Sequence, residues 1–384
     1  MKVLIAMDSF KGSISSIEGS KAISAGIKEV YPEAQIVTLP LADGGEGTVE
    51  ALIRATDGNV VEKEVMGPLK EKVTAVYGIL GDGKTAIIET AAACGLPLVP
   101  SNQRNPLLTT TYGVGELIAD AIDKGCREFV IGLGGSATND AGIGMLQALG
   151  FRFYNKHNEE VGIDGQALKD IYKMELEHVN AKLKECTFRI ACDVKNPLYG
   201  PMGAAYIFGP QKGATPEMVK QLDEGLKHFA DIVQDALGVD INQIEGAGAA
   251  GGLGAAFSGF LNGQLQSGID LVLEIIDMEK SMEGADFVIT GEGKLDGQTS
   301  MGKAPLGVAQ LAQKQGIPVI ALAGGITEET AALNELGITS YFSIMNTPMS
   351  LEEAMEPKVT YTNLRTTATQ LFRLLQAVQA VVKV

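Results

Sequence analysis

The sequence predicts an α/β protein with a doubly wound parallel sheet. Five short, almost uncharged apolar runs have the length and β-branched content of strands that are buried on both faces. Helical patterns separate consecutive runs near both ends of the chain, and strands that alternate with helices form sheets of this kind. Five such strands favour the flavodoxin-like order within the flavodoxin and Rossmann group. The runs are VLIAM (3–7), QIVTL (35–39), DFVIT (286–290), PVIAL (318–322) and SYFSI (340–344).

The helical patterns follow the strands in order. Segment 16–30 follows the first run, 303–315 follows the third, and 327–336 follows the fourth. A last helix is predicted at 363–383, because its leucine and valine residues recur at the spacing of one helical face. The residues of that face are Leu371, Leu374, Leu375, Val378 and Val382.

The middle of the chain, residues 67–280, has a sequence pattern unlike that of the two ends. We interpret it as a second α/β domain. A helix is expected near 111–124, and the strand-like run FVIG (129–132) follows it. We expect this domain to be inserted into the first one, which then comprises 1–66 and 281–384, with the active site in the cleft between the two domains. The alternative is that FVIG and the helix before it join the parallel sheet.

The stretch GILGDGKT (78–85) matches the phosphate-loop pattern G-x-x-x-x-G-K-[ST] at every position. That motif binds phosphate only where a strand ends at the first Gly and a helix begins at the Lys. Here VTAVY lies before it and KTAIIET after it, and both have the character of strands. Asp82-Gly83 between two such runs favours a β-hairpin, because that turn needs residues that tolerate φ > 0. We therefore interpret the stretch as a hairpin.

Charge and composition exclude several classes of function. The net charge of −16 argues against a nucleic-acid surface or a patch for anionic membranes. A small anionic substrate remains compatible, because a local cationic pocket can lie within an acidic protein. The four cysteines have no C-x-x-C spacing and the three histidines form no zinc-type pair, as expected for free thiols in a reducing cytoplasm. The uncharged stretch 246–269 is too rich in Gly, Asn and Gln to favour a membrane-spanning helix.

Polar, Gly-rich phrases follow four of the predicted strands. They are DSFKGS (8–13), ADGGEGT (42–48), GEGKLDGQTSMGK (291–303) and AGGI (323–326). In open α/β sheets ligands bind outside the carboxyl ends of the strands, so these phrases predict the ligand edge. The candidate substrate- and phosphate-binding residues at this edge are Asp8, Ser9, Asp43, Gly44, Gly45, Glu46, Lys294, Gln298, Thr299 and Lys303.

Two phrases of the middle segment carry further candidates. In GLGGSATND (132–140), Gly134, Gly135 and Ser136 follow a strand and can form a phosphate cradle, while Asn139 and Asp140 can add polar or metal contacts. The alternative there is a glycine turn with Asp140 as a helix cap. In DVKNP (193–197), Asp193 at a strand end is a hard oxygen ligand suited to Mg²⁺, or else a loop cap.

Two partial motifs point elsewhere. GQTSMGKA (297–304) fails as a phosphate loop because Ala304 replaces the Ser/Thr, but it can bring Lys303 to an anion at a helix N-terminus. GAGAAG (246–251) matches a dinucleotide fingerprint, yet GVDINQIE before it makes a weak strand. We interpret that motif as a tight loop that enters a helix of small residues, with an NAD-dependent 2-hydroxyacid oxidoreductase as the alternative function.

Seven phrases together resemble the type I glycerate kinase family, in the right order from Lys2 to nearly the C-terminus. The resemblance implies two α/β domains and the phosphorylation of D-glycerate, which depends on ATP and Mg²⁺. It also implies that 2-phosphoglycerate is the product, as is general in bacterial members, with transfer to the 3-hydroxyl as the alternative. The phrases are DSFKGS, ADGGEGT, GLGGSATND, ACDVKNPLYGP, FGPQKGA, GAGAAGGLGAA and TGEGKLDGQT.

Phosphoryl transfer needs cations on the phosphates and an acceptor for the hydroxyl proton. In view of the resemblance, we assign Lys11 to the glycerate carboxylate or the transferred phosphate, Asp193 to Mg²⁺ and Asp296 to the glycerate hydroxyl. The roles of the two aspartates are exchangeable. Asp140 and Glu292 are the other metal candidates. The expected partners are the small molecules D-glycerate and ATP, with neither nucleic acid nor membrane, and a homodimer is one expected assembly. A non-catalytic acid-binding module would leave the lysines and carboxylates of both domains unexplained.

Overall fold

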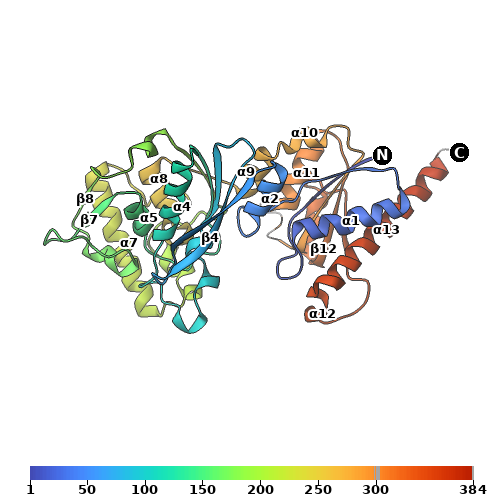
Figure 1. Ribbon diagram of the computed structural model, residues 1–384. Helices are drawn as coiled ribbons and strands as arrows, with labels where there is room; N and C mark the ends of the chain where they lie inside the picture. The colour runs from blue at the N-terminus through green and yellow to red at the C-terminus, as the bar shows by residue number, and fades with distance from the viewer. Residues whose placement is uncertain (298, 300–302, 383–384) are drawn as a thin grey trace. The chain divides into compact units, whose positions relative to one another are not determined.

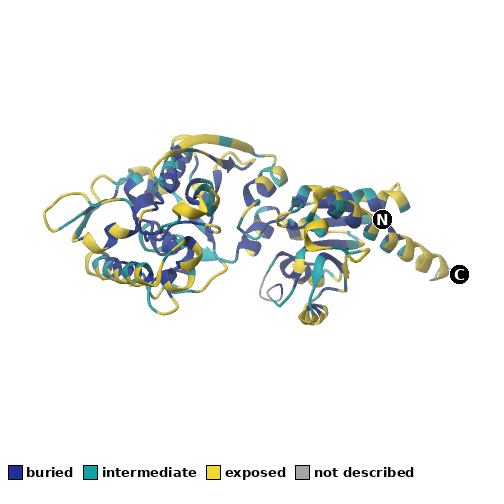
Figure 2. Ribbon diagram, turned by 90° about the horizontal axis from the view of Figure 1, so that it is seen from below, coloured by how far each residue is buried: buried dark blue, intermediate teal, exposed yellow. Residues whose placement is uncertain are grey.

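The computed structural model describes residues 1–297, 299 and 303–382, and the chain forms two compact units (Figure 1). Unit 1 comprises Met1–Asp43, Glu50–Ala55 and Ile269–Val384, and unit 2 comprises Gly44–Val49 and Thr56–Gly268. Each unit has its own sheet and its own buried core, as the dark blue segments of Figure 2 indicate.

The sheet of unit 1 has five strands, all parallel, in the order β13-β12-β11-β1-β2. When these five strands are renumbered 1 to 5 in chain order, the sheet has the order 2-1-3-4-5, which is the flavodoxin arrangement. The predicted strand count and order are therefore confirmed. The strands are β1 (Lys2–Met7), β2 (Gln35–Thr38), β11 (Phe287–Leu295), β12 (Val319–Ile326) and β13 (Ser340–Ser343).

Helices cover both faces of this sheet. Alternate residues of β1 belong to the same buried cluster as the inner faces of α1 and α13, whereas α11 contacts β1 and β11 and therefore lies on the other face. A capping box between Ser15 and Glu18 begins α1. The helical segments are α1 (Ser16–Val30), α2 (Thr48–Ala55), α9 (Gly268–Ile275), α10 (Met278–Met282), α11 (Ala304–Lys314), the 3₁₀ helix η8 (Glu328–Asn334), α12 (Leu351–Met355) and α13 (Pro357–Val382).

The last helix differs from its prediction. It begins at Pro357, and its buried face consists of Leu364, Ala368 and Phe372, with Leu371 and Leu375 beside them. Leu374 and Val378 are 62% and 51% exposed, so the predicted stripe is displaced around the helix. The packing of α13 against α1 orients the helix and accounts for the displacement.

The sheet of unit 2 is mixed, with six strands in the order β10-β9-β6-β5-β4-β3. FVIG forms β6 between β5 and β9, so the alternative that placed it in the first sheet is wrong. The strands are β3 (Asn59–Met66), β4 (Lys72–Ile79), β5 (Thr85–Glu89), β6 (Glu128–Gly132), β9 (Thr187–Ala191) and β10 (Gln264–Gln266), and β7 (Arg152–Tyr154) pairs with β8 (Lys173–Glu175) in a separate ribbon.

The strand β3 corrects a predicted boundary. Residues 59–66 were expected in the first domain, but β3 pairs antiparallel with β4 along its whole length. The reason is local: the chain reverses between Met66 and Lys72, where the Gly67 amide donates to the Glu71 carbonyl at 2.6 Å, and Lys70 has a φ of 70°. Residues 269–280 likewise lie in unit 1 rather than in the inserted segment.

Helices and aromatic side chains build the core of unit 2. Phe129 and Phe188 stack with their ring centroids 4.8 Å apart, and Phe153, Phe229 and Phe260 form a second aromatic group. The helical segments are α3 (Ala91–Cys94), α4 (Tyr112–Asp123), α5 (Ile143–Ala148), α6 (Ala204–Phe208), α7 (Pro216–Leu237) and α8 (Leu253–Leu261), with the 3₁₀ helices η1 (Leu96–Leu98), η2 (Ser101–Gln103), η3 (Gly165–Asp170), η4 (Ala181–Glu185), η5 (Pro210–Lys212) and η6 (Ala249–Gly251).

The stretch 78–85 is a β-hairpin, as predicted. β4 and β5 pair antiparallel through it, and Gly83 takes the φ of +68° that the turn requires. The Asp82 carboxylate accepts hydrogen bonds from the amides of Lys84 and Thr85 and from the Thr85 hydroxyl, at 2.8, 2.9 and 2.6 Å. Because a strand rather than a helix follows, the amides do not converge on a phosphate site.

The GAGAAG stretch is also as predicted. It consists of turns and the 3₁₀ helix η6, the chain before it is a turn rather than a strand, and α8 begins two residues after it at Leu253. A Cβ atom on Gly251 would collide with the Thr138 carbonyl, so this glycine serves packing against the neighbouring loop. Among the helices of the described residues, none combines the length and apolar character that a membrane span needs.

Candidate active site

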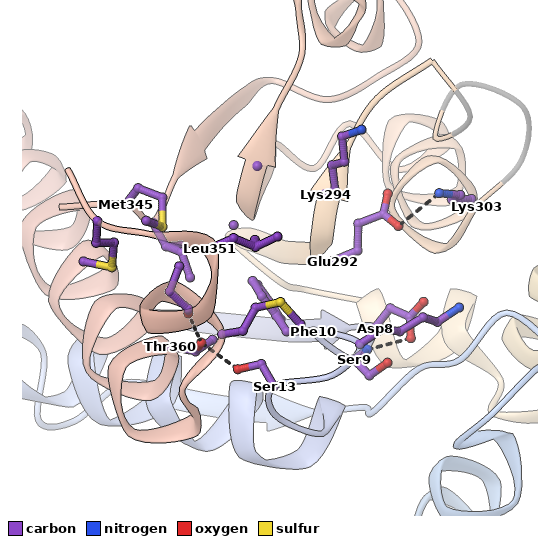
Figure 3. Close-up of a pocket in the computed structure, with 18 of the residues that line it drawn as sticks. Asp8, Ser9, Phe10, Ser13, Glu292, Lys294, Lys303, Met345, Leu351 and Thr360 are labelled. Atoms are coloured by element: carbon purple, nitrogen blue, oxygen red, sulfur yellow. Dashed lines mark hydrogen bonds and ion pairs between the residues drawn. The ribbon is translucent and has the colours of Figure 1, made fainter. Parts of the chain in front are cut away.

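A pocket of about 560 Å³ opens in unit 1 at the carboxyl ends of β1, β11, β12 and β13 (Figure 3). The predicted edge phrases after β1, β2, β11 and β12 all contribute to it. Its lining residues are Asp8, Ser9, Phe10, Lys11, Ser13, Asp43, Glu292, Gly293, Lys294, Lys303, Gly324, Gly325, Ile344, Met345, Met349, Ser350, Leu351, Ala354, Met355 and Thr360.

Asp8 is a buried carboxylate at the end of β1. Its amide donates to the Gly291 carbonyl at 2.9 Å, which extends the strand pairing, and only 4% of the residue is exposed. Burial, and next the charge of Asp43, raise the pKa of Asp8 to about 7, although a 2.6 Å hydrogen bond from the Ser9 amide opposes the shift. A carboxylate with a pKa near neutrality can accept a proton from a reacting hydroxyl.

Lys11 lies beside this carboxylate. Its Nζ is 3.2 Å from Oδ2 of Asp43, and its side chain is 60% exposed, so the ammonium reaches the pocket. Burial of part of the side chain acts to lower the pKa of Lys11, but the charges of Asp43 and Asp8 outweigh it and raise the pKa. The lysine is therefore fully charged near neutral pH and available to an anion.

The segment after β11 brings a second group of charges to the pocket. Oε1 of Glu292 accepts a hydrogen bond from the Thr299 hydroxyl at 2.6 Å, and burial raises the pKa of Glu292. Lys303 is the residue before the first turn of α11, as predicted, and its Nζ lies 3.8 Å from Glu292 and 3.9 Å from Asp296. Lys294 lies 3.4 Å from the other oxygen of Asp296. Gln298, a further candidate, lies outside the described residues.

The candidates of unit 2 lie at the carboxyl ends of its parallel strands. Gly44, Gly45 and Glu46 form a loop in which the Gly45 carbonyl accepts a 2.7 Å hydrogen bond from the Thr48 hydroxyl. Gly44 packs against Ala191 at the end of β9, and Glu46 is exposed. This loop is therefore near the strand ends of the second sheet rather than part of the pocket described above.

The predicted phosphate cradle has a charged residue behind it that sequence reasoning missed. Gly134 and Gly135 are exposed, while the buried Ser136 hydroxyl accepts a 2.9 Å hydrogen bond from Nζ of Lys212. The same ammonium donates to the Thr138 carbonyl at 2.6 Å. Burial lowers the pKa of Lys212 to about 8. A lysine in a Gly- and Pro-containing phrase normally predicts an exposed side chain, so no sequence signal marked it.

Asp140 and Asn139 are both fully buried. Asp140 accepts hydrogen bonds from the amide and the hydroxyl of Thr111, both at 2.8 Å, and from the Gly142 amide at 3.1 Å. Its oxygens are thus occupied by protein donors, but Asp140 is not the helix cap of the alternative, because the N-cap of α5 is Gly142 and has no side-chain cap. The Asn139 amide has no hydrogen-bond partner among the described residues.

Asp193 follows β9 and is exposed, and its Oδ1 accepts a hydrogen bond from the Gly268 amide at 3.0 Å, in keeping with the loop-cap alternative. Across the part of the chain that the structure describes, no group of three or more His, Cys, Asp or Glu side chains is arranged to hold a metal ion by itself. Of the three metal candidates, only Glu292 lines the unit 1 pocket.

A family model and two relatives of this chain point to the same family. A model of the glycerate kinase family matches residues 3–376. The chain is 49% identical over 361 residues to the glycerate kinase of Bacillus subtilis strain 168, which covers 94% of each chain. It is 48% identical over 354 residues to the glycerate 2-kinase of Escherichia coli K12, covering 92% of this chain and 93% of that one.

A solved structure extends the similarity to the fold. The crystal structure of a protein from Salmonella typhimurium LT2, named provisionally as glycerate kinase 2, superposes with a TM-score of 0.90 at 45% sequence identity. The match covers 99% of both chains.

Proposed function

Since this chain belongs to the glycerate kinase family and is a kinase, we propose that it transfers the terminal phosphoryl group of ATP to the 2-hydroxyl of D-glycerate. The product is 2-phospho-D-glycerate. The observation that carries the proposal is the pair of Asp8 and Lys11 in the unit 1 pocket: a buried carboxylate with a pKa of about 7 next to a charged lysine. One can accept the hydroxyl proton while the other neutralises the substrate's carboxylate.

The base in this proposal is Asp8. Asp296, the residue favoured by sequence reasoning, lies within ion-pair distance of Lys294 and Lys303. The oxygens of Asp296 therefore face two ammonium groups rather than a substrate hydroxyl. We assign it the task of holding those two lysines toward the phosphates. Burial, and next the charge of Asp43, hold the pKa of Asp8 at about 7 although Lys11 lies beside it, and this value is near the working pH.

Lys11 binds the glycerate carboxylate in this proposal, and Lys303 at the start of α11 meets the transferred phosphoryl group. A helix N-terminus with a lysine is a favourable place for an anion. The proposed cellular compartment is the cytoplasm, which agrees with the four free thiols.

The pocket residues fit Mg²⁺. Mg²⁺ is usually held by one or two carboxylates together with substrate phosphates, so a set of three protein ligands is not required. Asp8, Asp43 and Glu292 are near enough to one another that the charges of Asp43 and Glu292 raise the pKa of Asp8. Such a group of carboxylates favours a cation, and we assign Glu292 and Asp43 to hold it. When bound, Mg²⁺ neutralises charge on the phosphate oxygens.

Product analysis by ³¹P NMR tests the proposal, with purified protein, D-glycerate and Mg-ATP. We expect ADP and 2-phosphoglycerate to form together. Formation of 3-phosphoglycerate would move the transfer to the other hydroxyl, and ADP formation that does not depend on glycerate would reject the substrate. The oxidoreductase alternative lacks the strand that its fingerprint needs before Gly246. An absorbance assay with NAD and glycerate is expected to show no hydride transfer.

A further inference from the structure

The unit 1 pocket has two chemically different halves (Figure 3). The carboxylates and lysines described above form the charged half, and Figure 3 shows Asp8, Glu292 and Lys303 together there. Met345 and Leu351 lie on the opposite side, where few polar side chains line the wall. The residues of this apolar half are Phe10, Ile344, Met345, Met349, Leu351, Ala354 and Met355.

Glycerate alone does not account for the apolar half. Its roughly seven non-hydrogen atoms, each at no more than the ~30 Å³ that a water molecule occupies, fill about 200 Å³. The pocket measures about 560 Å³. Glycerate also carries a carboxylate and two hydroxyls, and polar groups lose free energy against a wall that offers no hydrogen bond. The molecule therefore belongs in the charged half, and the pocket has room for a second, less polar group.

We infer that the apolar half binds the purine base and ribose of the nucleotide, with the phosphates directed to the charged half. This inference rests on the proposed function, which requires a purine nucleoside triphosphate. Such a ligand has a flat, weakly polar end joined to a polyanion, and the pocket has the same division. Methionine side chains suit a flat ring because they are flexible and their sulfur atoms make favourable contacts with aromatic groups.

The helix α12 and the loop after β1 join the two halves. Met355 at the end of α12 packs on Gly12, where a Cβ atom would lie 2.7 Å from the methionine Cε. Gly12 also has a φ of +80°, so no other residue is easily accommodated there. Because Gly12 follows Lys11 directly, a base against the α12 wall has its phosphates within reach of the charged loop.

The polar side chains on the apolar side already have partners within the protein. The hydroxyls of Ser13 and Thr360 are 2.7 Å apart, and Thr360 also donates to the Ala354 carbonyl at 2.9 Å. Ser350 takes part in a capping box with Glu353. Binding of the base thus depends on apolar contact area, and polar substitutions on this wall should weaken it.

The test is a set of glutamine substitutions, because glutamine replaces apolar side-chain surface with a polar amide and, at the methionine positions, nearly keeps the shape. The variants are Leu351→Gln alone and Met345→Gln/Met349→Gln, with Val378→Gln on the exposed face of α13 as the matched control. The full-length protein is titrated with ATP and, separately, with inorganic tripolyphosphate, which has the charges but no base. KM for glycerate is measured on the same samples, and circular dichroism checks folding.

We expect the Kd for ATP to rise about tenfold or more in the pocket variants, since each loses apolar contact with the base. Tripolyphosphate binding and the KM for glycerate should stay within about threefold of wild type. Leu351 is 76% exposed, so its single variant should fold whatever the double variant does. Unchanged ATP affinity, or an equal loss for ATP and tripolyphosphate, overturns the inference.

The outcome is separable from that of the proposed function. Wild-type protein that forms no phosphoglycerate from glycerate and Mg-ATP contradicts the function itself. Protein that forms it, but whose pocket variants bind ATP as wild type does, contradicts only the base site. A change in the glycerate KM in place of the ATP affinity would assign the apolar wall to the acceptor and would also overturn the inference.

Discussion

Replacing Asp43 by asparagine probes the environment of Asp8 without removing Asp8 itself. Asp8 has a pKa of about 7 because it is buried and because the charge of Asp43 adds to the effect of burial. If ionised Asp8 accepts the hydroxyl proton, kcat/KM for glycerate falls as the pH drops below about 7. Asp43→Asn removes one negative charge near Asp8 and leaves Lys11 without its partner at 3.2 Å. Both changes favour ionised Asp8, so the acid limb should move to lower pH.

The size of the effect follows from the ionisation equilibrium. Well below the pKa, each unit by which the pKa falls multiplies the ionised fraction about tenfold, or about 1.4 kcal/mol. The measurement is kcat/KM for glycerate by a coupled assay for ADP, from about pH 5 to about pH 9. The variant loses some activity at its optimum, because Asp43 also lines the pocket, so the position of the limb and not its height is compared.

Stability gives an independent readout of the same group. A raised carboxylate pKa means that the folded state binds the proton more tightly than the unfolded state, whose Asp pKa is 3.8. The stabilising contribution of protonated Asp8 is fully present below pH 3.8 and is lost as the pH rises through about 7. Relative to Asp8→Asn, the wild-type free energy of unfolding should fall by roughly 4 kcal/mol across this window. An acid limb that persists in Asp8→Asn, or does not move in Asp43→Asn, would refute the reasoning.

Three further outcomes are expected. Lys11→Met should lower kcat/KM for glycerate by about a hundredfold or more, because a charge-assisted contact is lost. The free energy of unfolding should fall by less than about 1 kcal/mol, because the ion pair of Lys11 is half exposed. Near-normal kinetics would remove Lys11 from the site. Lys84→Ala, in the exposed hairpin, should leave kcat within about threefold, and a hundredfold loss would restore the phosphate loop. The wild-type free energy of unfolding, measured by denaturant titration relative to Lys212→Met, should rise by roughly 3 kcal/mol between about pH 8 and pH 10.5. The reason is that burial lowers the pKa of Lys212 in the folded state to about 8. A difference that does not change with pH would place the ammonium in solvent.

The parts of the fold that the sequence predicts are those with a local signal. Buried parallel strands are nearly all apolar, so β1 and β12 are evident as short runs between helices. Asp82-Gly83 marks its hairpin because few residues tolerate that turn. The convergence of Asp8, Lys11 and Lys303 could be expected as well, since the carboxyl ends of parallel strands share one edge.

The missed features depend on contacts between distant segments. Nothing near Lys212 in the chain indicates that Ser136 and the Thr138 carbonyl accept its protons. Asp140 resembles a metal ligand until Thr111, from a different segment, is found to donate to it. The pairing of β3 with β4 is another case, because an exposed, charged strand such as NVVEKEVM does not reveal which sheet it joins.

The strand β11 continues past the point where β1 ends. Its pairing with β12 runs through Lys294 opposite Gly325 and Leu295 opposite Ile326. Glu292 and Lys294 are two residues apart on this ladder, so their side chains leave the same face, and both line the pocket. One residue inserted between Gly291 and Glu292 would turn both charges away from the pocket while the strand could still pair. Changes in chain length should therefore be tolerated in surface turns but not in this part of β11. The strand backbone, and not a loop, sets the spacing of Glu292 and Lys294.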